Sequence, residues 1–243
     1  MNNNWRFLLK PFWLFTHFFV LTVVVGCLFL SNWQFIRLAE KKEFNTNIQS
    51  KTQSERLDID SALKLDNLEY RPVKASVEIV KDDLIRVVNR SYQGAAGEHV
   101  VALAKLESNK YILVNRGFVP LNVDDIGLLT GQDVTVEGWL RNSIEKDFFG
   151  VTDNLNESQA PRFDVNAISQ RIDPEQRPVN FWIQVETIDG VNSNDLPIAL
   201  SLPDLDEGSH LSYAMQWIVF ALLTIVFYFF ILRRKSKQIT ADE

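Results

Sequence analysis

Three histidines are the residues of this chain best suited to bind a metal ion: His17, His99 and His210. Neutral imidazole is the commonest protein ligand of transition metals, and it titrates near neutral pH. His17 lies inside a long apolar run, His99 inside a stretch typical of a β-strand, and His210 directly before a second apolar run. Any ligand role of each histidine therefore depends on its surroundings.

Aromatic and polar residues gather where the first apolar run ends and where the second begins. They are Trp33, Gln34, Arg37 and Lys41 in the first group, and His210, Tyr213, Gln216 and Trp217 in the second. If a helix continues past the first run, Trp33, Arg37 and Lys41 share one face, because they are spaced by four. Two explanations stay open. Such residues often anchor helices at lipid headgroups, or they form a binding site.

The rest of the sequence argues against an enzyme. It contains no nucleophile elbow, no HExxH motif and no phosphate-binding glycine loop. The acidic pairs Asp82-Asp83 and Asp124-Asp125 occupy turn-like positions, where solvated charge is normal, so we expect no metal there. The single cysteine, Cys27, follows Val24-Val25-Gly26. A lipoprotein signal, in which this cysteine would be lipidated, therefore stays an alternative. The apolar residues that continue after Cys27 argue against it.

Two apolar runs are long enough to cross a membrane, and we place them at 12–30 and 213–232. A helix of about 19 residues is roughly 28 Å long, close to the thickness of the hydrocarbon core. Basic residues lie outside both runs: Arg6 and Lys10 before the first, and Arg233, Arg234, Lys235 and Lys237 after the second. Because Lys and Arg concentrate on the cytoplasmic side, we expect 1–11 and 233–243 in the cytoplasm and 31–212 outside it.

Charge and the start of the chain favour a bacterial plasma (inner) membrane. The formal net charge is −6, and most acidic residues lie between the apolar runs. An acidic extracytoplasmic region argues against a nucleic-acid partner. The first residues, MNNNWRFLLKP, lack the Arg- and Ser-rich character of an organellar transit peptide.

The region between the runs predicts an α+β protein in which terminal helices flank a mostly antiparallel sheet. β-Branched and aromatic residues predict strands at 73–80, 84–89, 99–106, 111–115, 133–140 and 181–187. Turn signals separate them, among them Lys81-Asp82-Asp83. The polar stretch 40–67 favours a helix, and 145–176 reads as a long excursion with a short helix after Asp164.

The stretch Asn115-Arg116-Gly117, followed by Pro120, has two interpretations. The simpler one is a turn at a strand end, in which Gly117 adopts a positive φ and Pro120 stops strand pairing. In the other, Arg116 bridges the sheet to a partner. The turn is the favoured interpretation.

Four stretches in this order, between two terminal apolar runs, resemble the SURF1 (Surfeit locus 1) family. They are Trp33-Gln34 with Arg37 and Lys41, Arg71-Pro72-Val73, the run 114–120 (VNRGFVP), and His210-Leu211-Ser212-Tyr213-Ala214 with Gln216-Trp217. Departures are modest: Ser31 stands where the family usually has Gly, and Phe118 where it usually has Trp.

The resemblance implies an assembly factor for a haem-copper terminal oxidase, chiefly cytochrome c oxidase, that handles haem a. His210 is then the expected iron ligand, Arg37 pairs with a haem propionate, and Trp33, Gln34, Tyr213, Gln216 and Trp217 complete the cofactor site. His17 is separated from the outer surface by roughly 20 Å of helix, too far to share that iron. It can instead face the partner helix and bond Thr16, Thr22 or Thr224.

The partners that the resemblance implies are oxidase subunit I, other oxidase assembly factors and the membrane. The alternative is a docking or stabilising partner of an oxidase subunit that never binds haem. A membrane sensor fits less well, because about 11 residues after the second run are too few to fold as an output domain.

Overall fold

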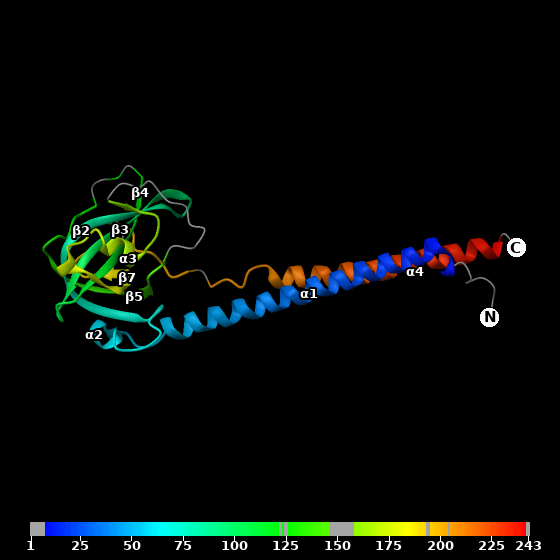
Figure 1. Cartoon of the computed structure of the whole chain (residues 1–243), viewed down its shortest axis with the longest axis horizontal. Coiled ribbons are helices and arrows are strands. Elements are labelled where there is room, and N and C mark those ends of the chain that lie inside the picture. Colours follow the sequence, from blue (N-terminus) through cyan, green and yellow to red (C-terminus); the bar gives the residue numbers. More distant parts are fainter. Residues whose placement is uncertain are drawn as a thin grey trace. The chain divides into compact units, whose positions relative to one another are not determined.

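The computed structural model describes residues 8–121, 123, 126–145, 158–192, 195–203 and 205–241. They form two compact units, one of helices (residues 8–47 and 205–241) and one rich in strands (residues 48–203). Figure 1 shows the two long helices of the first unit lying side by side. The α+β class, with long apolar helices at both ends of the chain, is confirmed.

The helical unit is built from α1 (Pro11–Thr52) and α4 (His210–Ala241). Less exposed positions recur along both helices at alternating spacings of four and three, which is the pattern of two helices packed with a slight left-handed twist. On α1 they are Trp13, His17, Val20, Val24, Cys27, Ser31, Gln34, Leu38, Lys41 and Asn45; on α4 they are His210, Ala214, Trp217, Ala221, Thr224 and Tyr228. We call these residues the helix seam.

Small residues occupy the most buried part of the helix seam. Cys27, Ser31, Ala214 and Ala221 are all below one tenth exposed, and small side chains allow two helices to approach closely in a membrane. By length and composition, both helices are able to span a membrane. α1 continues past Leu30 to Thr52, because no Gly or Pro interrupts the chain in that stretch.

The strand-rich unit is a closed ring of five strands, β2–β3–β4–β7–β5, in which β5 pairs again with β2. Two short strands pair with β2 outside the ring. In chain order the elements are β1 (Leu57–Asp58), α2 (Ile59–Ala62), β2 (Pro72–Tyr92), β3 (Ala95–Leu106), β4 (Tyr111–Pro120), β5 (Asp133–Asn142), β6 (Gln159–Ala160), α3 (Val165–Ser169), η2 (Pro174–Gln176) and β7 (Pro178–Ile188).

Two apolar cores lie on the two faces of this ring. Alternate residues of all five strands, such as Val77, Ala104 and Ile183, form the first core. The opposite faces of β2, β3, β4 and β7 form the second core with the segment around α3, where Phe163 stacks on Trp182 with 4.1 Å between ring centroids. Inward and outward side chains alternate along each strand because the strand period is two.

The sheet is mixed, which corrects the prediction of a mostly antiparallel one. β4 and β7 pair in parallel, as Val114 opposite Ile183 illustrates, whereas β2–β3, β3–β4, β2–β5 and β5–β7 are antiparallel. The long connection between β5 and β7 carries the chain back to pair with β4. The short helix predicted after Asp164 is confirmed as α3, and the Asp164 carboxylate accepts a hydrogen bond from the backbone N–H of Ala167.

The predicted turn at Lys81-Asp82-Asp83 is wrong. β2 is one bent strand of 21 residues, and the three residues lie at irregularities in its pairing with β3. Asp83 has a φ of +48°. A bulge inserts extra residues that bend a strand without ending it, so the polar triplet marks a bend within the strand.

Candidate functional site

His210 is the first residue of α4 and contacts α1. Its Nδ1 lies 2.9 Å from the side-chain oxygen Oε1 of Gln34, and both side chains are half-buried. The two residues come from opposite ends of the chain, and the pairing of α1 with α4 brings them together. This is the one hydrogen bond between residues of the two predicted interface groups that we find in the described part of the chain.

The segment that leads into α4 is held by other polar residues of α1. The Asn45 amide donates to the carbonyl oxygen of Leu205 at 2.6 Å and to that of Asp206 at 3.3 Å. Lys42 lies 3.3 Å from the Glu207 carboxylate. Further along the helix seam, the Ser31 hydroxyl donates to the Ala214 carbonyl at 3.1 Å.

The Ser31 side chain is small enough to fit within the helix seam, and it also donates a hydrogen bond across the seam. Together the contacts of α1 fix the place at which α4 begins, and so the place of His210.

The other residues of the two interface groups are more exposed. Trp33 and Tyr213 are about half exposed, at 47% and 50%. Gln216 is exposed, and Trp217 is half-buried with its ring edge against Phe220. α1 is continuous here, so Trp33, Arg37 and Lys41 do share one helix face.

Arg37 and Lys41 both contact neighbours on α1. Arg37 forms an ion pair with Glu40 at 2.7 Å, and both side chains are more than half exposed. The Lys41 ammonium lies 5.4 Å from the centre of the Phe44 ring. Exposed ion pairs contribute at most about 1 kcal/mol, so the Arg37 guanidinium can exchange Glu40 for another carboxylate at little cost.

His17 lies on the helix seam and faces α4, but its partner there is Tyr228 rather than one of the three threonines considered. The Tyr228 hydroxyl contacts Nδ1, and Nε2 lies 3.2 Å from the Leu8 carbonyl. Thr16, Thr22 and Thr224 each donate to the carbonyl four residues earlier on their own helix. Both imidazole nitrogens of His17 are occupied, which fits a role in holding the helices together.

His99 belongs to β3 in the strand-rich unit, where its ring lies 6.1 Å from that of Phe163. Burial, assisted by the positive charge of Arg90, lowers the pKa of His99 from 6.5 to about 4. Its Nδ1 is buried and has no hydrogen-bond partner in the described part of the chain. A neutral, buried imidazole is in keeping with the structural role expected for it.

Arg116 does not lie in a turn, so the favoured interpretation of Asn115-Arg116-Gly117 is wrong. Both Asn115 and Arg116 lie within β4 and are buried. Arg116 forms a buried ion pair with the Asp82 carboxylate, which also accepts from the backbone N–H of Leu129 at 2.9 Å. Burial lowers the pKa of Arg116, and the charge of Asp82 opposes that shift.

The remaining residues of the stretch behave as expected from their types. Gly117 has a φ of +134°, and a Cβ there would lie 2.1 Å from the carbonyl oxygen of Ile198. Only glycine fits so close an approach. Pro120 is the last residue of β4. The whole stretch therefore has a structural function in the strand-rich unit.

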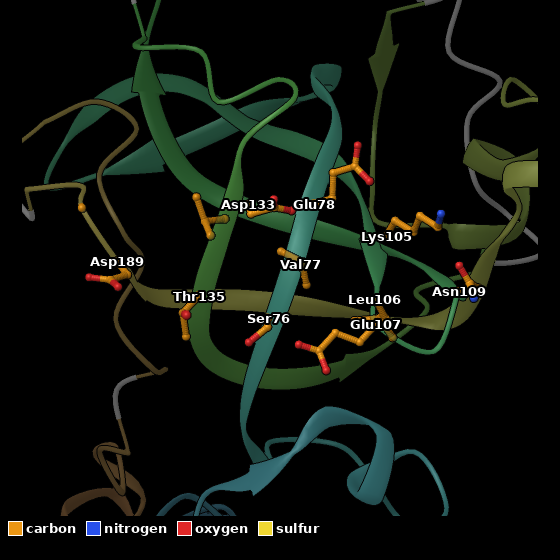
Figure 2. A pocket seen from close by; sticks show the side chains of 12 residues that line it. Ser76, Val77, Glu78, Lys105, Leu106, Glu107, Asn109, Asp133, Thr135 and Asp189 are labelled. Atoms are coloured by element: carbon orange, nitrogen blue, oxygen red, sulfur yellow. The ribbon is translucent and has the colours of Figure 1, made fainter.

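One cavity of about 570 Å³ in the strand-rich unit is lined by residues of β2, β3 and β5 and of the turns beside them (Figure 2). Carboxylates dominate its lining, since Glu78, Glu107, Asp133 and Asp189 accompany one cation, Lys105. An acidic lining repels carboxylate groups. This cavity is therefore a poor match for a ligand that carries carboxylates.

No group of three or more His, Cys, Asp or Glu side chains among the described residues could hold a metal ion. Asp82 is paired with Arg116, and the Asp124-Asp125 pair lies outside the described residues. Cys27 is a free, buried cysteine on the helix seam.

The fold defines a class of protein in which two terminal apolar helices pair and a strand-rich unit is inserted between them. The family model of the SURF1 family matches residues 21–222. The chain therefore belongs to the SURF1 family, as its motifs predicted.

Two relatives illustrate the similarity. A SURF1-like protein of Rickettsia prowazekii (strain Madrid E) is 26% identical over 239 residues, which cover 92% of this chain and 91% of the relative. A SURF1-like protein of Rickettsia felis (strain ATCC VR-1525 / URRWXCal2) is 26% identical over 227 residues, covering 88% and 95% of the two chains. The similarity extends over both helices and the strand-rich unit.

Sequence reasoning missed three residues that organise these sites. Asp82 resembled a solvated turn residue, although it interrupts an otherwise alternating strand pattern. Ser31 and Asn45 are polar members of the four-and-three spacing on α1. Their places in that spacing, 14 positions apart, were the available signal, because a polar residue at a seam position often pairs with the partner helix.

Proposed function

We propose that this protein is a non-catalytic, membrane-anchored assembly factor of cytochrome c oxidase that holds haem a transiently at His210. Membership of the SURF1 family supports the role in oxidase assembly. In this proposal α1 and α4 cross a bacterial inner membrane, with both termini in the cytoplasm and the strand-rich unit on the outer side. The basic residues in the C-terminal part of α4, after its apolar run, support that orientation.

The observation that carries the haem proposal is the environment of His210. Its Nδ1 is engaged by Gln34, whereas Nε2 has no hydrogen-bond partner in the described part of the chain. A neutral imidazole with one free nitrogen is the usual axial ligand of haem iron. Haem supplies the iron that accepts this lone pair, and the protein supplies the ligand and its orientation.

Neighbouring side chains suit the rest of the porphyrin. Trp33, Tyr213 and Trp217 lie on the same pair of helices as His210 and offer apolar ring surface. Arg37 can exchange its weak partner Glu40 for a propionate. A single strong axial ligand suits a carrier, because a second one would slow transfer to oxidase subunit I, on which we propose that the strand-rich unit docks.

The test is visible absorption of the detergent-purified protein after co-expression with haem a synthesis. We expect wild type to carry haem, and we expect His210→Ala to lose it while keeping its fold. His99→Gln is the matched control, because it removes a histidine from the strand-rich unit. If wild type and His210→Ala retain the same haem, His210 is not the ligand. If wild type retains none, the docking role without haem replaces the carrier role.

A further inference from the structure

We infer that Gln34 is a positioning residue that fixes the tautomer and the orientation of His210, so that Nε2 is the nitrogen presented to a metal. An amide oxygen only accepts hydrogen bonds. In the inferred arrangement, His210 Nδ1–H donates to Gln34 Oε1, which lies 2.9 Å away. In neutral imidazole the lone pair then lies on Nε2. This inference rests on the proposed function and assigns Gln34 a role within it.

The backbone around the contact is held independently of the two side chains. Asn45 bonds the carbonyls of Leu205 and Asp206, and Ser31 bonds the carbonyl of Ala214. These bonds fix the chain on both sides of His210 against α1. Gln34 therefore has a fixed target, and its bond selects the ring orientation rather than building the local fold.

The Nε2 edge of the ring faces Gly208. A Cβ at position 208 would lie 3.6 Å from His210 Cδ2 and 3.8 Å from Nε2, and Gly208 has a φ of +70°. A side chain at position 208 would therefore contact this edge of the imidazole, and glycine places none there. Gln34 and Gly208 thus have complementary effects, since the first contacts Nδ1 and the second places no side chain against Nε2.

The chemistry of Gln34 also bears on how tightly a metal is held. A carboxylate on the distal nitrogen makes imidazole a stronger donor, whereas a neutral amide oxygen orients the ring with less effect on its donor strength. Gln34 thus provides orientation with moderate ligand strength. That combination suits a protein that must release its ligand.

The first experiment uses the haem-free full-length protein and measures the tautomer directly. Nitrogen-15 NMR of histidine-labelled protein in lipid nanodiscs distinguishes a protonated from an unprotonated ring nitrogen, with His17 and His99 assigned by substitution. We expect the proton of His210 on Nδ1 in wild type, and a mixture of both tautomers in Gln34→Met. A proton on Nε2 in wild type, or a tautomer unchanged in Gln34→Met, overturns the inference.

The second experiment measures affinity for haem a in the same variants. Loss of a partner on the distal nitrogen typically weakens metal binding about 10- to 100-fold, so we expect a loss of that size in Gln34→Met. In Gln34→Glu, binding should be retained and the reduction potential lowered. Gln49→Met is the matched control, because it makes the same substitution at an exposed position of α1. An equal loss in Gln49→Met overturns the inference in favour of a general effect on the helix.

The two experiments separate the two proposals. If wild type binds no haem, the proposed carrier function fails and Gln34 has no ligand role, whichever tautomer NMR finds. If wild type binds haem but Gln34→Met binds it equally well with an unchanged spectrum, only the inference about Gln34 fails.

Discussion

The two units of this protein differ in how fully their inward-facing polar side chains are hydrogen-bonded. In the strand-rich unit, the Asp82 carboxylate accepts from Arg116 and from backbone N–H groups, and its charge is fully enclosed. In the helical unit, His210 is half-buried and has one nitrogen engaged and one without a partner in the described part of the chain. Closed polar networks stabilise a fold, whereas an open polar atom at a fixed position can bind a ligand. The comparison explains why we expect the larger losses of stability in the strand-rich unit and why the proposed ligand site lies in the helical unit.

The largest effect should come from Arg116→Met. It leaves the buried carboxylate of Asp82 without its counter-charge, which typically destabilises a protein by about 3–5 kcal/mol. We expect an early unfolding transition of the strand-rich unit in chemical denaturation of the full chain. Arg56→Met is the control, since Arg56 bridges partly exposed carboxylates of Glu137 and Glu186 and should cost about 1 kcal/mol or less. Equal losses of stability in the two variants would show that burial of the Arg116–Asp82 pair does not increase its contribution to stability.

A smaller effect is expected for Asn45→Leu in the helical unit. The change removes the two hydrogen bonds to the chain before α4 and leaves their carbonyls unpaired, at a cost of about 1–3 kcal/mol. Hydrogen exchange of residues 205–209 should accelerate while exchange in the five-stranded ring stays the same. Lys42→Gln, which loses only an exposed ion pair, serves as its control. Acceleration throughout the ring would contradict the separation of the two units.

The pH dependence of stability should depend on His99 in the strand-rich unit. Its pKa is lowered from 6.5 to about 4 in the folded state, so between these values the unfolded chain binds a proton that the folded chain does not. Stability should therefore fall as pH drops from 6.5 towards 4, by at most about 1.4 kcal/mol per pH unit. Above pH 6.5 this contribution is constant.

Denaturation midpoints measured across this pH range test the expectation. His99→Gln should flatten that part of the profile, and an unchanged slope in this variant would exclude His99 as its origin.

The smallest effect on stability is expected for Arg37→Gln. The exposed pair with Glu40 contributes about 0.5 kcal/mol or less to the helix, so the unfolding transition should not move. Haem affinity, in contrast, should fall several-fold if the guanidinium binds a propionate, and Lys41→Gln should leave it unchanged. A fall in both variants would indicate a general charge effect at this helix face.

Much of the architecture could be predicted from residue types. Apolar composition located both long helices, and β-branched alternation located most of the strands, because each signal is local. The first membrane span was predicted to end at Leu30, because the composition becomes polar there. The helix itself, α1, continues to Thr52. Parallel pairing of β4 with β7 has no local signal, since it depends on the path of a long connection.

The candidate site was predicted in part. Gln34 and His210 were both placed at the interface, but their contact depends on the register of two helices separated by the whole strand-rich unit. Asp82 was misread because its partner Arg116 lies 34 residues further on, and a charged residue next to another charge resembles a turn. The ligand roles of Arg37, Trp33, Tyr213, Gln216 and Trp217 stay predictions.

The sequence separation of Gln34 and His210, 176 positions, has a consequence for biosynthesis. α1 leaves the ribosome first, the strand-rich unit follows, and α4 is made last. A chain interrupted after residue 34 and before residue 210 carries Gln34 but not the imidazole that contacts it. Only a chain that includes α4, paired with α1, can form the contact between Gln34 and His210.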